Sequence, residues 1–379
     1  MLYILLRGYF PGLAPNNHYM GWLKSFDELG VNATVVNIRP NDDFERMPEV
    51  YKNLKIVNLW DNPFFRVRNR QLRFLVHQFN VWRFCRKVKA GDTVWIYDLP
   101  EAVIKLAGRK DVHVFNEVTE HPEIGADSAR AKERARKRVE AIKKIDGLFV
   151  ISTKLKQAYV DRGVDAGKIH IINMTVDADR FNGLQKQGDE KSIVFCGHGA
   201  NNKDGVDQLI KAFAKVHEQH SEFLLKIIGP APQRGDASGN VELVERLGLT
   251  ESVIFCGRKS PDEVPQLLKN ATILALDRPD SLQAQNGFPT KLGEYLLTEN
   301  PVCVTNVGDI PLFLKNGESA LIAEHDNVED FATKLLWAIN HPSEAYEIGR
   351  RGADVARIHF NVMTEAKKMI DVMRLFVRI

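Results

Sequence analysis

Short runs of apolar residues alternate with longer stretches of mixed polarity from one end of the chain to the other. The short runs are typical of buried strands, and the mixed stretches repeat their apolar positions about every 3.6 residues, as helices do. The stretch 206–216 is an example of the second kind. The predicted strands are 2–6, 33–38, 55–59, 93–97, 112–115, 147–151, 168–172, 192–196, 222–228, 252–256, 271–276, 301–305 and 319–322.

This alternation predicts an α/β protein with two parallel sheets. Strands that are apolar along their whole length are buried on both faces, which requires helices on each side. The polar, aperiodic segment 182–191 divides the chain into halves with enough strands for one Rossmann-like sheet each. We predict Rossmann-like domains over 1–182 and 183–360 that face a central cleft, and a terminal helix over 361–379 that packs back on the first domain. Because such sheets bind ligands beyond the carboxyl ends of their strands, the chemistry should lie in the loops there.

Composition is typical of a folded protein and excludes several classes. Of the 379 residues, 44% are hydrophobic and 27% are charged, which argues against disorder. The net charge is only +3, so we predict no nucleic-acid partner. The four cysteines are scattered and form no Cys-x-x-Cys pair, which argues against a disulfide framework and against a zinc site.

The small net charge of the whole chain does not reveal one strongly basic segment. Residues 62–91 hold eight Arg or Lys residues and no acid, and aromatic residues are interleaved with them. This composition fits a helix that lies on an anionic membrane surface, and the alternative is an ordinary helix with solvated arginines and buried aromatics. The apolar start of the chain is too short for a leader, and no run could span a bilayer. We expect a cytoplasmic protein with peripheral attachment to the inner face of the cell membrane.

The segment 286–295 could carry chemistry on one face of a helix. Pro289 suits the first turn of a helix, and Thr290, Lys291 and Glu294 then share one arc of about 100°. Free backbone N–H groups at this helix start, together with Lys291, suit a phosphate, and a ribose diol could donate two hydrogen bonds to Glu294. The alternative is a capped helix with a solvated polar face.

A glycine-rich turn over 195–205 follows a predicted strand and leads into a helix that should start near Lys203. Such a turn allows the backbone to approach an anion closely. The turn lacks the third glycine of the dinucleotide fingerprint, which makes a dehydrogenase the weaker hypothesis. Taken alone, such a turn is weak evidence for a ligand site, and the alternative is a purely structural turn.

Two further strand-end loops carry polar groups. In the first, over 115–122, Glu117, Glu120 and His121 could orient a hydroxyl group, unless the loop is only a helix cap. In the second, over 256–263, a capping box from Ser260 to Glu263 follows Arg258, and its backbone could bind the edge of a base. A plain capped helix is the alternative there.

In this order, the segments resemble the nucleotide-sugar domain of retaining glycosyltransferases of the GT-B type, family 4 (group 1). The resemblance is carried by the glycine turn with 203–213 and by 254–257, 287–296, 301–305 and 316–322, while 173–177 resembles the loop that ends the first domain. It covers residues 145–340 and reaches 1–144 only in outline.

The resemblance implies a metal-independent glycosyltransferase of the hexosyltransferase type. Its co-substrate would be a nucleotide-diphosphate sugar, it would need no cofactor, and it would act with retention on a glycan or lipid-linked acceptor in polysaccharide or glycolipid biosynthesis. Lys203 would contact the diphosphate, Glu294 the ribose, and the backbone near Arg258 the base. The implied catalytic residues are Glu120, His121 and Lys203. The residues implied for donor binding are Gly197, His198, Gly199, Lys203, Arg258, Asn286, Gly287, Phe288, Pro289, Thr290, Lys291 and Glu294.

Two positions depart from that family's pattern. His198 stands where an arginine usually follows the glycine, and Asn286 stands where the first of two glutamates is usual. A neutral imidazole lacks the arginine's permanent charge, so Lys203 and Lys291 would have to supply more of the positive field. Two other hypotheses are a sugar-nucleotide epimerase on the same plan, and a non-catalytic subunit that binds a nucleotide sugar or a membrane.

Overall fold

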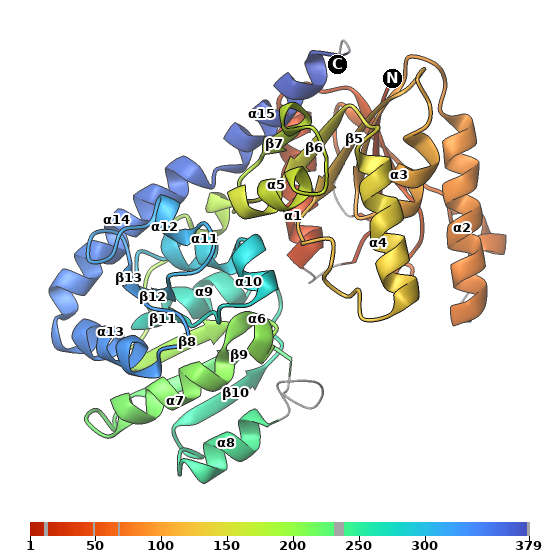
Figure 1. The fold of residues 1–379 in the computed structure, drawn as a ribbon. Helices are drawn as coiled ribbons and strands as arrows, with labels where there is room; N and C mark the ends of the chain where they lie inside the picture. The colour runs from red at the N-terminus through yellow and green to blue at the C-terminus, as the bar shows by residue number, and fades with distance from the viewer. Residues whose placement is uncertain (11–13, 48–49, 67–68, 231–238, 377–379) are drawn as a thin grey trace. The chain divides into compact units, whose positions relative to one another are not determined.

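The computed structural model describes residues 1–10, 14–47, 50–66, 69–230 and 239–376 (Figure 1). By their internal contacts the residues form two compact units. The first unit comprises Met1–Asn173 and Val362–Ile379, and the second comprises Met174–Asn361.

The described part of the first unit contains a parallel sheet of seven strands in the order β3-β2-β1-β4-β5-β6-β7. The strands are β1 (Leu2–Leu6), β2 (Ala33–Asn37), β3 (Leu54–Asn58), β4 (Thr93–Tyr97), β5 (His113–Val118), β6 (Gly147–Val150) and β7 (Ile169–Ile171). The helices are α1 (Ala14–Glu28), η1 (Pro63–Phe65), α2 (Arg70–Lys87), α3 (Pro100–Leu106), α4 (Ala129–Ile142), α5 (Thr153–Val160), η2 (Ala166–Lys168) and α15 (Val362–Arg374). Helices α2, α3 and α4 lie side by side, and α1 packs against α15 (Figure 1).

The described part of the second unit contains a parallel sheet of six strands in the order β10-β9-β8-β11-β12-β13. The strands are β8 (Ser192–Cys196), β9 (Leu224–Ile228), β10 (Val253–Gly257), β11 (Ile273–Leu276), β12 (Val302–Thr305) and β13 (Leu321–Ala323). The helices are η3 (Ala178–Phe181), α6 (Asn201–Asp204), α7 (Val206–His217), α8 (Asn240–Arg246), α9 (Val264–Lys269), α10 (Leu282–Asn286), α11 (Thr290–Leu297), α12 (Ile310–Phe313), α13 (Val328–Asn340) and α14 (Pro342–His359). Helix α7 packs on α13 and α8, and α11 packs on α14.

The prediction of two parallel-sheet, Rossmann-like domains is confirmed. Every predicted strand is present, with its ends within three residues of the expected positions. The strands read as apolar runs because they are covered on both faces: β4 and β6 are buried along their whole length. In the first unit, Met369, Ile370 and Met373 of α15 complete a core with Trp22 of α1 and Trp95 of β4.

The boundary between the units lies nine residues before the predicted residue 182. Residues 174–182 belong to the second unit because Val176 forms a parallel bridge with Asn361, and its N–H donates to the carbonyl oxygen of Phe360 over 3.0 Å. At the other end of the chain, α14 belongs to the second unit and α15 to the first.

Each sheet reverses its strand order once. The reversal lies between β1 and β4 in the first unit and between β8 and β11 in the second. Loops that leave the carboxyl ends of the strands at such a point diverge and leave room for a ligand. Among the described residues, no helix is both long enough and apolar enough to cross a membrane.

Candidate functional site

The glycine turn after β8 lies against the start of α11. A Cβ atom added to Gly197 would come within 2.3 Å of the Nζ atom of Lys291. A Cβ atom added to Gly229 would come within 2.0 Å of the carbonyl oxygen of Gly197. Gly199 has a φ of +80°, in the left-handed region that favours glycine. These glycines therefore occur where the backbone passes close to a lysine head group and to a neighbouring loop.

The helix expected to start near Lys203 is divided in two. Lys203 lies in the short helix α6, Gly205 follows with a φ of +62°, and α7 begins at Val206. A Cβ atom on Gly205 would lie 1.6 Å from the carbonyl oxygen of Asp277. The backbone at Gly205 passes so close to the end of β11 that it leaves the helical path, which explains the break between α6 and α7.

Asp204, which was not among the predicted residues, is the buried carboxylate of this region. It is 2% exposed, its Oδ1 accepts a hydrogen bond from Lys291 Nζ over 2.5 Å, and its Oδ2 accepts one from the N–H of Gly199 over 3.2 Å. Burial alone would raise the pKa of Asp204, but attraction to Lys291, Arg278 and Lys203 lowers it below the usual value. Asp204 is therefore ionised and ties the glycine turn to α11.

Arg278, also absent from the predicted set, comes directly after Asp277 at the end of β11. It is 3% exposed, and its Nε and Nη1 atoms have no hydrogen-bond partner among the described residues. Burial lowers its pKa to about 10, so the guanidinium stays charged at neutral pH. Lys203 is close enough to depress the pKa of Lys291. Three cations thus surround one carboxylate, and a buried cation with unused donors is costly unless an anion pairs with it.

Glu294 lies one turn along α11 from Lys291, as the predicted helical face requires, but it is not free. Its carboxylate forms an ion pair with Arg180 of η3, and Arg180 also donates to the carbonyl oxygen of Pro261 over 2.7 Å. Burial raises the pKa of Glu294, while Arg180 and Lys291 oppose the rise. The solvated polar face offered as an alternative is wrong for Lys291 and Glu294, since both are partly buried and paired.

Three other predicted residues of the second unit, Asn286, Gly287 and Phe288, lie between the end of α10 and the start of α11. Asn286 is buried and its Nδ2 donates to the carbonyl oxygen of Leu282 over 2.9 Å. Phe288 packs its ring against Phe313 and Phe360 and is part of the core. A Cβ on Gly287 would lie 3.9 Å from Arg278 Nη2, which places that residue at the cationic cluster.

Pro289 and Thr290 begin α11, whereas two other predicted residues lie on the surface. Pro289 is the N-cap of α11 rather than part of its first turn, and no side-chain hydrogen bond caps the helix there. His198 and Arg258 are exposed in the loops after β8 and β10. The structure therefore gathers the glycine turn, Lys203 and Lys291 around Asp204 and leaves those two side chains in solvent.

Glu120 and His121 lie in the first unit, in the loop after β5. His121 is buried, and its Nδ1 accepts a hydrogen bond from the N–H of Glu123 over 3.2 Å, which leaves the hydrogen on Nε2. Burial and the nearby Arg162 lower the pKa of His121 below its usual value. The ring is therefore neutral at pH 7 and can donate through Nε2. Glu120 is exposed.

Two polar residues of the first unit, His18 and Asp98, were missed, whereas Glu117 was among the candidates. His18 of α1 contacts Glu117 of β5 over 2.5 Å, and both side chains are almost fully buried. Asp98, directly after β4, has a φ of +51° and pairs with Arg7 over 3.3 Å. Asp98 could have been found from the rule that polar residues directly after a strand mark a site, whereas nothing local predicts the pairing of His18 with Glu117.

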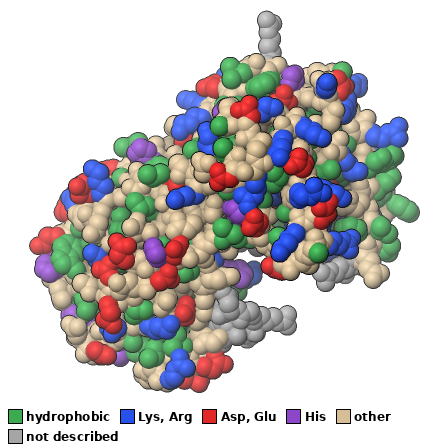
Figure 2. Space-filling model, in the orientation of Figure 1, with side chains coloured by type: hydrophobic (Ala, Val, Ile, Leu, Met, Phe, Trp, Pro, Cys, Tyr) green, Lys and Arg blue, Asp and Glu red, His purple; other side chains and the backbone are tan. Residues whose placement is uncertain are grey.

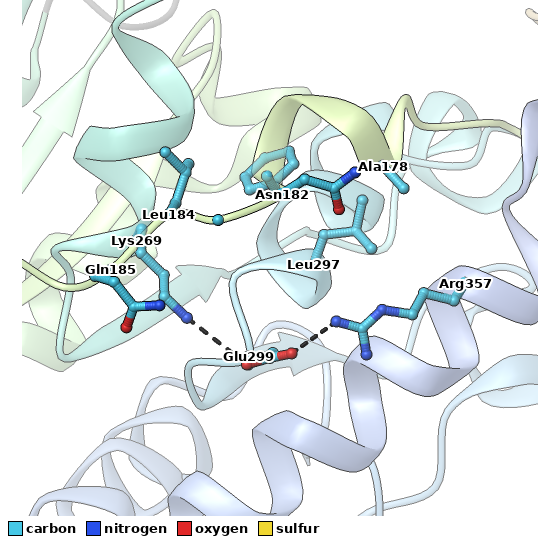
Figure 3. A pocket seen from close by; sticks show the side chains of 10 residues that line it. Ala178, Asn182, Leu184, Gln185, Lys269, Leu297, Glu299 and Arg357 are labelled. Atoms are coloured by element: carbon cyan, nitrogen blue, oxygen red, sulfur yellow. Dashed lines mark hydrogen bonds and ion pairs between the residues drawn. The ribbon is translucent and has the colours of Figure 1, made fainter.

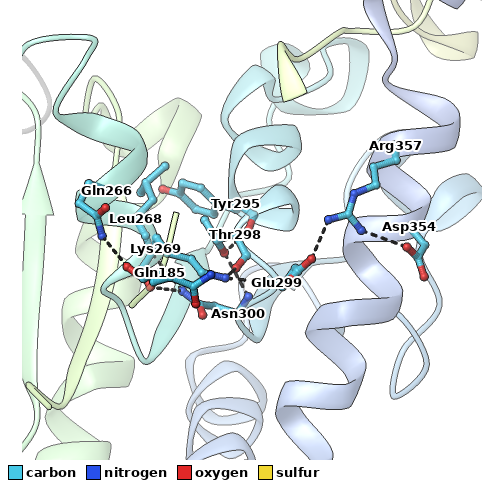
Figure 4. Close-up of polar contacts among 10 residues, drawn as sticks. All are labelled: Gln185, Gln266, Leu268, Lys269, Tyr295, Thr298, Glu299, Asn300, Asp354 and Arg357. Atoms are coloured by element: carbon cyan, nitrogen blue, oxygen red, sulfur yellow. Dashed lines mark hydrogen bonds and ion pairs between the residues drawn. The ribbon is translucent and has the colours of Figure 1, made fainter. Parts of the chain in front are cut away.

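A pocket of about 220 Å³ in the second unit is lined by residues that form ion pairs with one another (Figure 3). The carboxylate of Glu299 contacts Lys269 over 3.8 Å and Arg357 over 2.6 Å. Arg357 also pairs with Asp354, and Lys269 donates to the carbonyl oxygen of Thr298 over 2.7 Å (Figure 4). These partners come from the end of α9, the turn after α11 and α14. The network therefore joins these elements, and its two cations are balanced by two carboxylates.

Comparisons with known proteins find similar sequences for the second unit and for longer stretches of the chain. Residues 177–355 match the family model described as Glycosyl transferases group 1. An uncharacterized glycosyltransferase of Methanocaldococcus jannaschii is 26% identical over 182 residues, which are 47% of this chain and 48% of that protein. The D-inositol 3-phosphate glycosyltransferase of Corynebacterium jeikeium is 22% identical over 339 residues, 80% of this chain and 75% of that protein. The chain spans about half the length of most of the curated relatives that it matches.

Solved structures share the fold across the whole chain. Sucrose-phosphate synthase from Thermosynechococcus elongatus superposes with a TM-score of 0.77 at 15% identity and covers 99% of this chain and 98% of its own. The Anabaena protein HepE in complex with UDP gives a TM-score of 0.75 at 14% identity, covering 99% of both chains. The two Rossmann-like domains share the fold of these solved structures, and residues 177–355 are similar to the family of glycosyl transferases group 1.

Proposed function

We propose that this protein is a glycosyltransferase that moves a sugar from a nucleoside-diphosphate donor to an acceptor hydroxyl group. The observation that carries the proposal is the excess of positive charge that Lys203, Arg278 and Lys291 create around Asp204. This cluster lies at the strand-order reversal between β8 and β11, inside the segment that matches the family. A diphosphate supplies the negative charge that the cluster lacks.

In this proposal the donor is held by the second unit without a metal ion. Lys203 and Lys291 bind the diphosphate, and the turn carries no side chain at Gly197 and Gly199 that would obstruct it. Arg278 supplies the permanent charge that His198 cannot. Glu294 shares its carboxylate between Arg180 and the ribose hydroxyls.

The reaction we propose retains the anomeric configuration. The bond between the anomeric carbon and the diphosphate oxygen breaks, and the acceptor oxygen bonds to the same face of that carbon. The proton of the acceptor hydroxyl passes to the departing phosphate oxygen. The cationic cluster stabilises the negative charge on the leaving group, and His121, as a neutral donor through Nε2, positions the sugar.

The first test combines nucleotide binding with a transfer assay. UDP is the first probe because HepE was solved with UDP and with UDP-glucose. We expect a nucleoside diphosphate to raise the melting temperature of the wild-type protein, since a ligand that binds only the folded state stabilises it. We expect Lys203→Ala and Glu294→Ala to lose both this shift and sugar transfer, while Lys315→Ala, at an exposed pair with Glu318, keeps them.

Full transfer activity in both site variants would contradict the assigned site. Turnover of the donor in the absence of an acceptor would indicate an epimerase. Nucleotide-sugar binding with no transfer to any acceptor would indicate a non-catalytic subunit.

We also propose that the acceptor is met at an anionic membrane surface, where α2 makes contact. Four apolar residues of α2 follow helical spacing and are at least 43% exposed: Leu72, Leu75, Phe79 and Trp82. Arg86 lies over the Trp82 ring at 5.1 Å, and Arg83 lies over the Phe65 ring at 5.0 Å. Hydrophobic side chains protrude at the edge of the molecule where α2 lies (Figure 2). An exposed apolar stripe bordered by arginines suits a surface of anionic lipid. Of the basic segment 62–91, Val67 and Arg68 lie outside the described residues.

Vesicle binding tests the membrane contact. We expect the double variant Phe79→Ser, Trp82→Ser to bind vesicles of phosphatidylglycerol about tenfold or more weakly, because two aromatic anchors are lost. Leu312→Ser, which changes an exposed residue of the second unit, is the matched control. Equal binding by the double variant and the wild type would mean that α2 is an ordinary surface helix.

A further inference from the structure

The first unit contains a pocket of about 1040 Å³ that the donor chemistry does not use. Arg7 follows β1, Arg39 follows β2, and Glu101 lies in α3 after β4, so the pocket is at the carboxyl ends of three neighbouring strands. It thus lies where the strand order of the first sheet reverses, the position at which open parallel sheets bind ligands. Helix α2 supplies the remaining wall with Arg73 and Leu75 among its residues.

The charges of this pocket leave one guanidinium unpaired. Arg7 pairs with Asp98, Arg73 with Asp42, and His77 with Glu101 at 3.7 Å. Arg39 has no ion pair within the described chain.

Arg39 is also short of hydrogen-bond partners. Its Nε is buried and without a partner among those residues, and its guanidinium carbon lies 5.3 Å from the centre of the Phe10 ring. Burial and repulsion from Arg7 and Arg73 lower the pKa of Arg39, although Asp98 and Asp42 oppose the shift. An anion bound beside this guanidinium would stabilise its charged form.

The pairs that surround Arg39 can be exchanged. Asp42 is 80% exposed and Asp98 is 52% exposed at the side chain, so each carboxylate can move into water when an anion arrives. Three guanidinium groups then become available to one ligand. Guanidinium groups donate two parallel hydrogen bonds and match the tetrahedral oxygens of phosphate, whereas a single carboxylate could occupy only one of them.

We propose that this pocket binds a phosphate group of the acceptor through Arg7, Arg39 and Arg73. The identification of the ligand as the acceptor rests on the proposed glycosyltransferase function. The pocket is larger than a phosphate, and the exposed apolar side chains of Phe74 and Leu75 border it, so the rest of the ligand is accommodated beside the stripe on α2. Asp98, the partner of Arg7, is close enough to Glu120 for that carboxylate to raise its pKa, although burial is the larger cause. A phosphate held here therefore leaves the attached group near the loop of Glu120 and His121.

The same phosphate chemistry could come from a soluble phosphate ester or from a lipid headgroup. Glycerol 3-phosphate probes the first source and vesicles that carry phosphatidic acid probe the second. Vesicles that carry phosphatidylglycerol control for general attraction to anionic lipid. Binding is measured in a Lys203→Ala background, so that the donor site contributes little to the signal.

We expect Arg39→Gln to weaken binding of glycerol 3-phosphate, or of phosphatidic acid relative to phosphatidylglycerol, by about tenfold or more, the usual cost of losing a charged hydrogen-bond donor. Arg7→Gln, at a more exposed position, should act in the same direction and guards against a folding defect of the first variant. Arg134→Gln, at an exposed arginine of α4 outside the pocket, should leave both affinities unchanged.

Unchanged affinity in Arg39→Gln and Arg7→Gln, or no binding of either probe to the parent protein, would overturn the proposal. Because the readout is binding, it does not depend on transfer. Loss of phosphate binding in the arginine variants, together with no sugar transfer by the wild-type protein, would support the pocket and count only against the proposed function. Normal sugar transfer by the wild-type protein with no phosphate binding would support the proposed function and contradict the phosphate pocket.

Discussion

Two charge networks in the second unit look alike but differ in how completely their charges are paired. Around Asp204, three cations from different elements surround one buried carboxylate, and Arg278 has donors without partners among the described residues. Around Glu299, Lys269 and Arg357 pair with the carboxylate, and each makes a further contact to Thr298 or Asp354 (Figure 4). The difference teaches that positive charge left over at a strand end marks a ligand site, whereas a balanced network marks a structural clamp.

The largest effect that would separate the networks is expected from Lys291→Ala. Under the proposed function, removal of this cation should lower the rate of sugar transfer by about 10²–10³-fold, the usual cost of losing one group that stabilises developing charge. Lys269→Ala should leave the rate unchanged. Circular dichroism checks that both variants are folded. Equal rates in the two variants would mean that the network around Asp204 and the network around Glu299 do not differ in function.

A smaller effect is expected from Arg278→Met, which replaces a buried cation with an apolar side chain of comparable length. Nucleoside diphosphate should bind about tenfold more weakly, because one charge-assisted contact is lost. The melting temperature without nucleotide should stay the same or rise, since exchanging a buried charge for an apolar residue is often neutral or stabilising. Calorimetry measures the affinity, and unchanged affinity would mean that Arg278 serves the fold alone.

Asp277 and Asp204 should respond to pH in opposite directions. Burial, together with Asp207 and Asp326, raises the pKa of Asp277 to about 8, despite attraction to Lys211. The folded state therefore keeps a proton that the unfolded chain loses near pH 4, so this group makes the protein less stable as pH rises from about 4 to 8, by up to about 1.4 kcal/mol per pH unit. Asp204 has a lowered pKa in the folded state, so the folded protein becomes less stable as pH falls and this carboxylate is protonated.

Asp277→Asn tests this directly because asparagine keeps the shape and cannot ionise. We expect the variant to gain in melting temperature over the wild type as pH increases from 5 to about 8. A gap that stays constant with pH would show that Asp277 is already ionised in the folded protein.

The sequence was sufficient for the sheets, and it predicted several of the residues that the structure brings together around Asp204. Strands were found because apolar runs report burial on both faces, and Lys203, Lys291 and the glycines were found because their spacing along the chain is local. Asp204 and Arg278 were missed because their importance comes from contacts between α6, α11 and the end of β11, which no local spacing encodes. Glu294 was found without Arg180, its partner, because 114 residues separate them.

The smallest effect is expected from Arg357→Met in the balanced network. Its pairs with Glu299 and Asp354 are partly exposed, and such pairs contribute about 0–1 kcal/mol to the free energy of unfolding. The arginine side chain also packs at the pocket of Figure 3, so the methionine variant retains most of its apolar contact. We therefore expect a loss of at most about 1 kcal/mol in urea denaturation and no change in affinity for nucleoside diphosphate. A loss of affinity comparable to that of Arg278→Met would mean that ligand binding depends on both networks, so that pairing alone could not distinguish a site from a clamp.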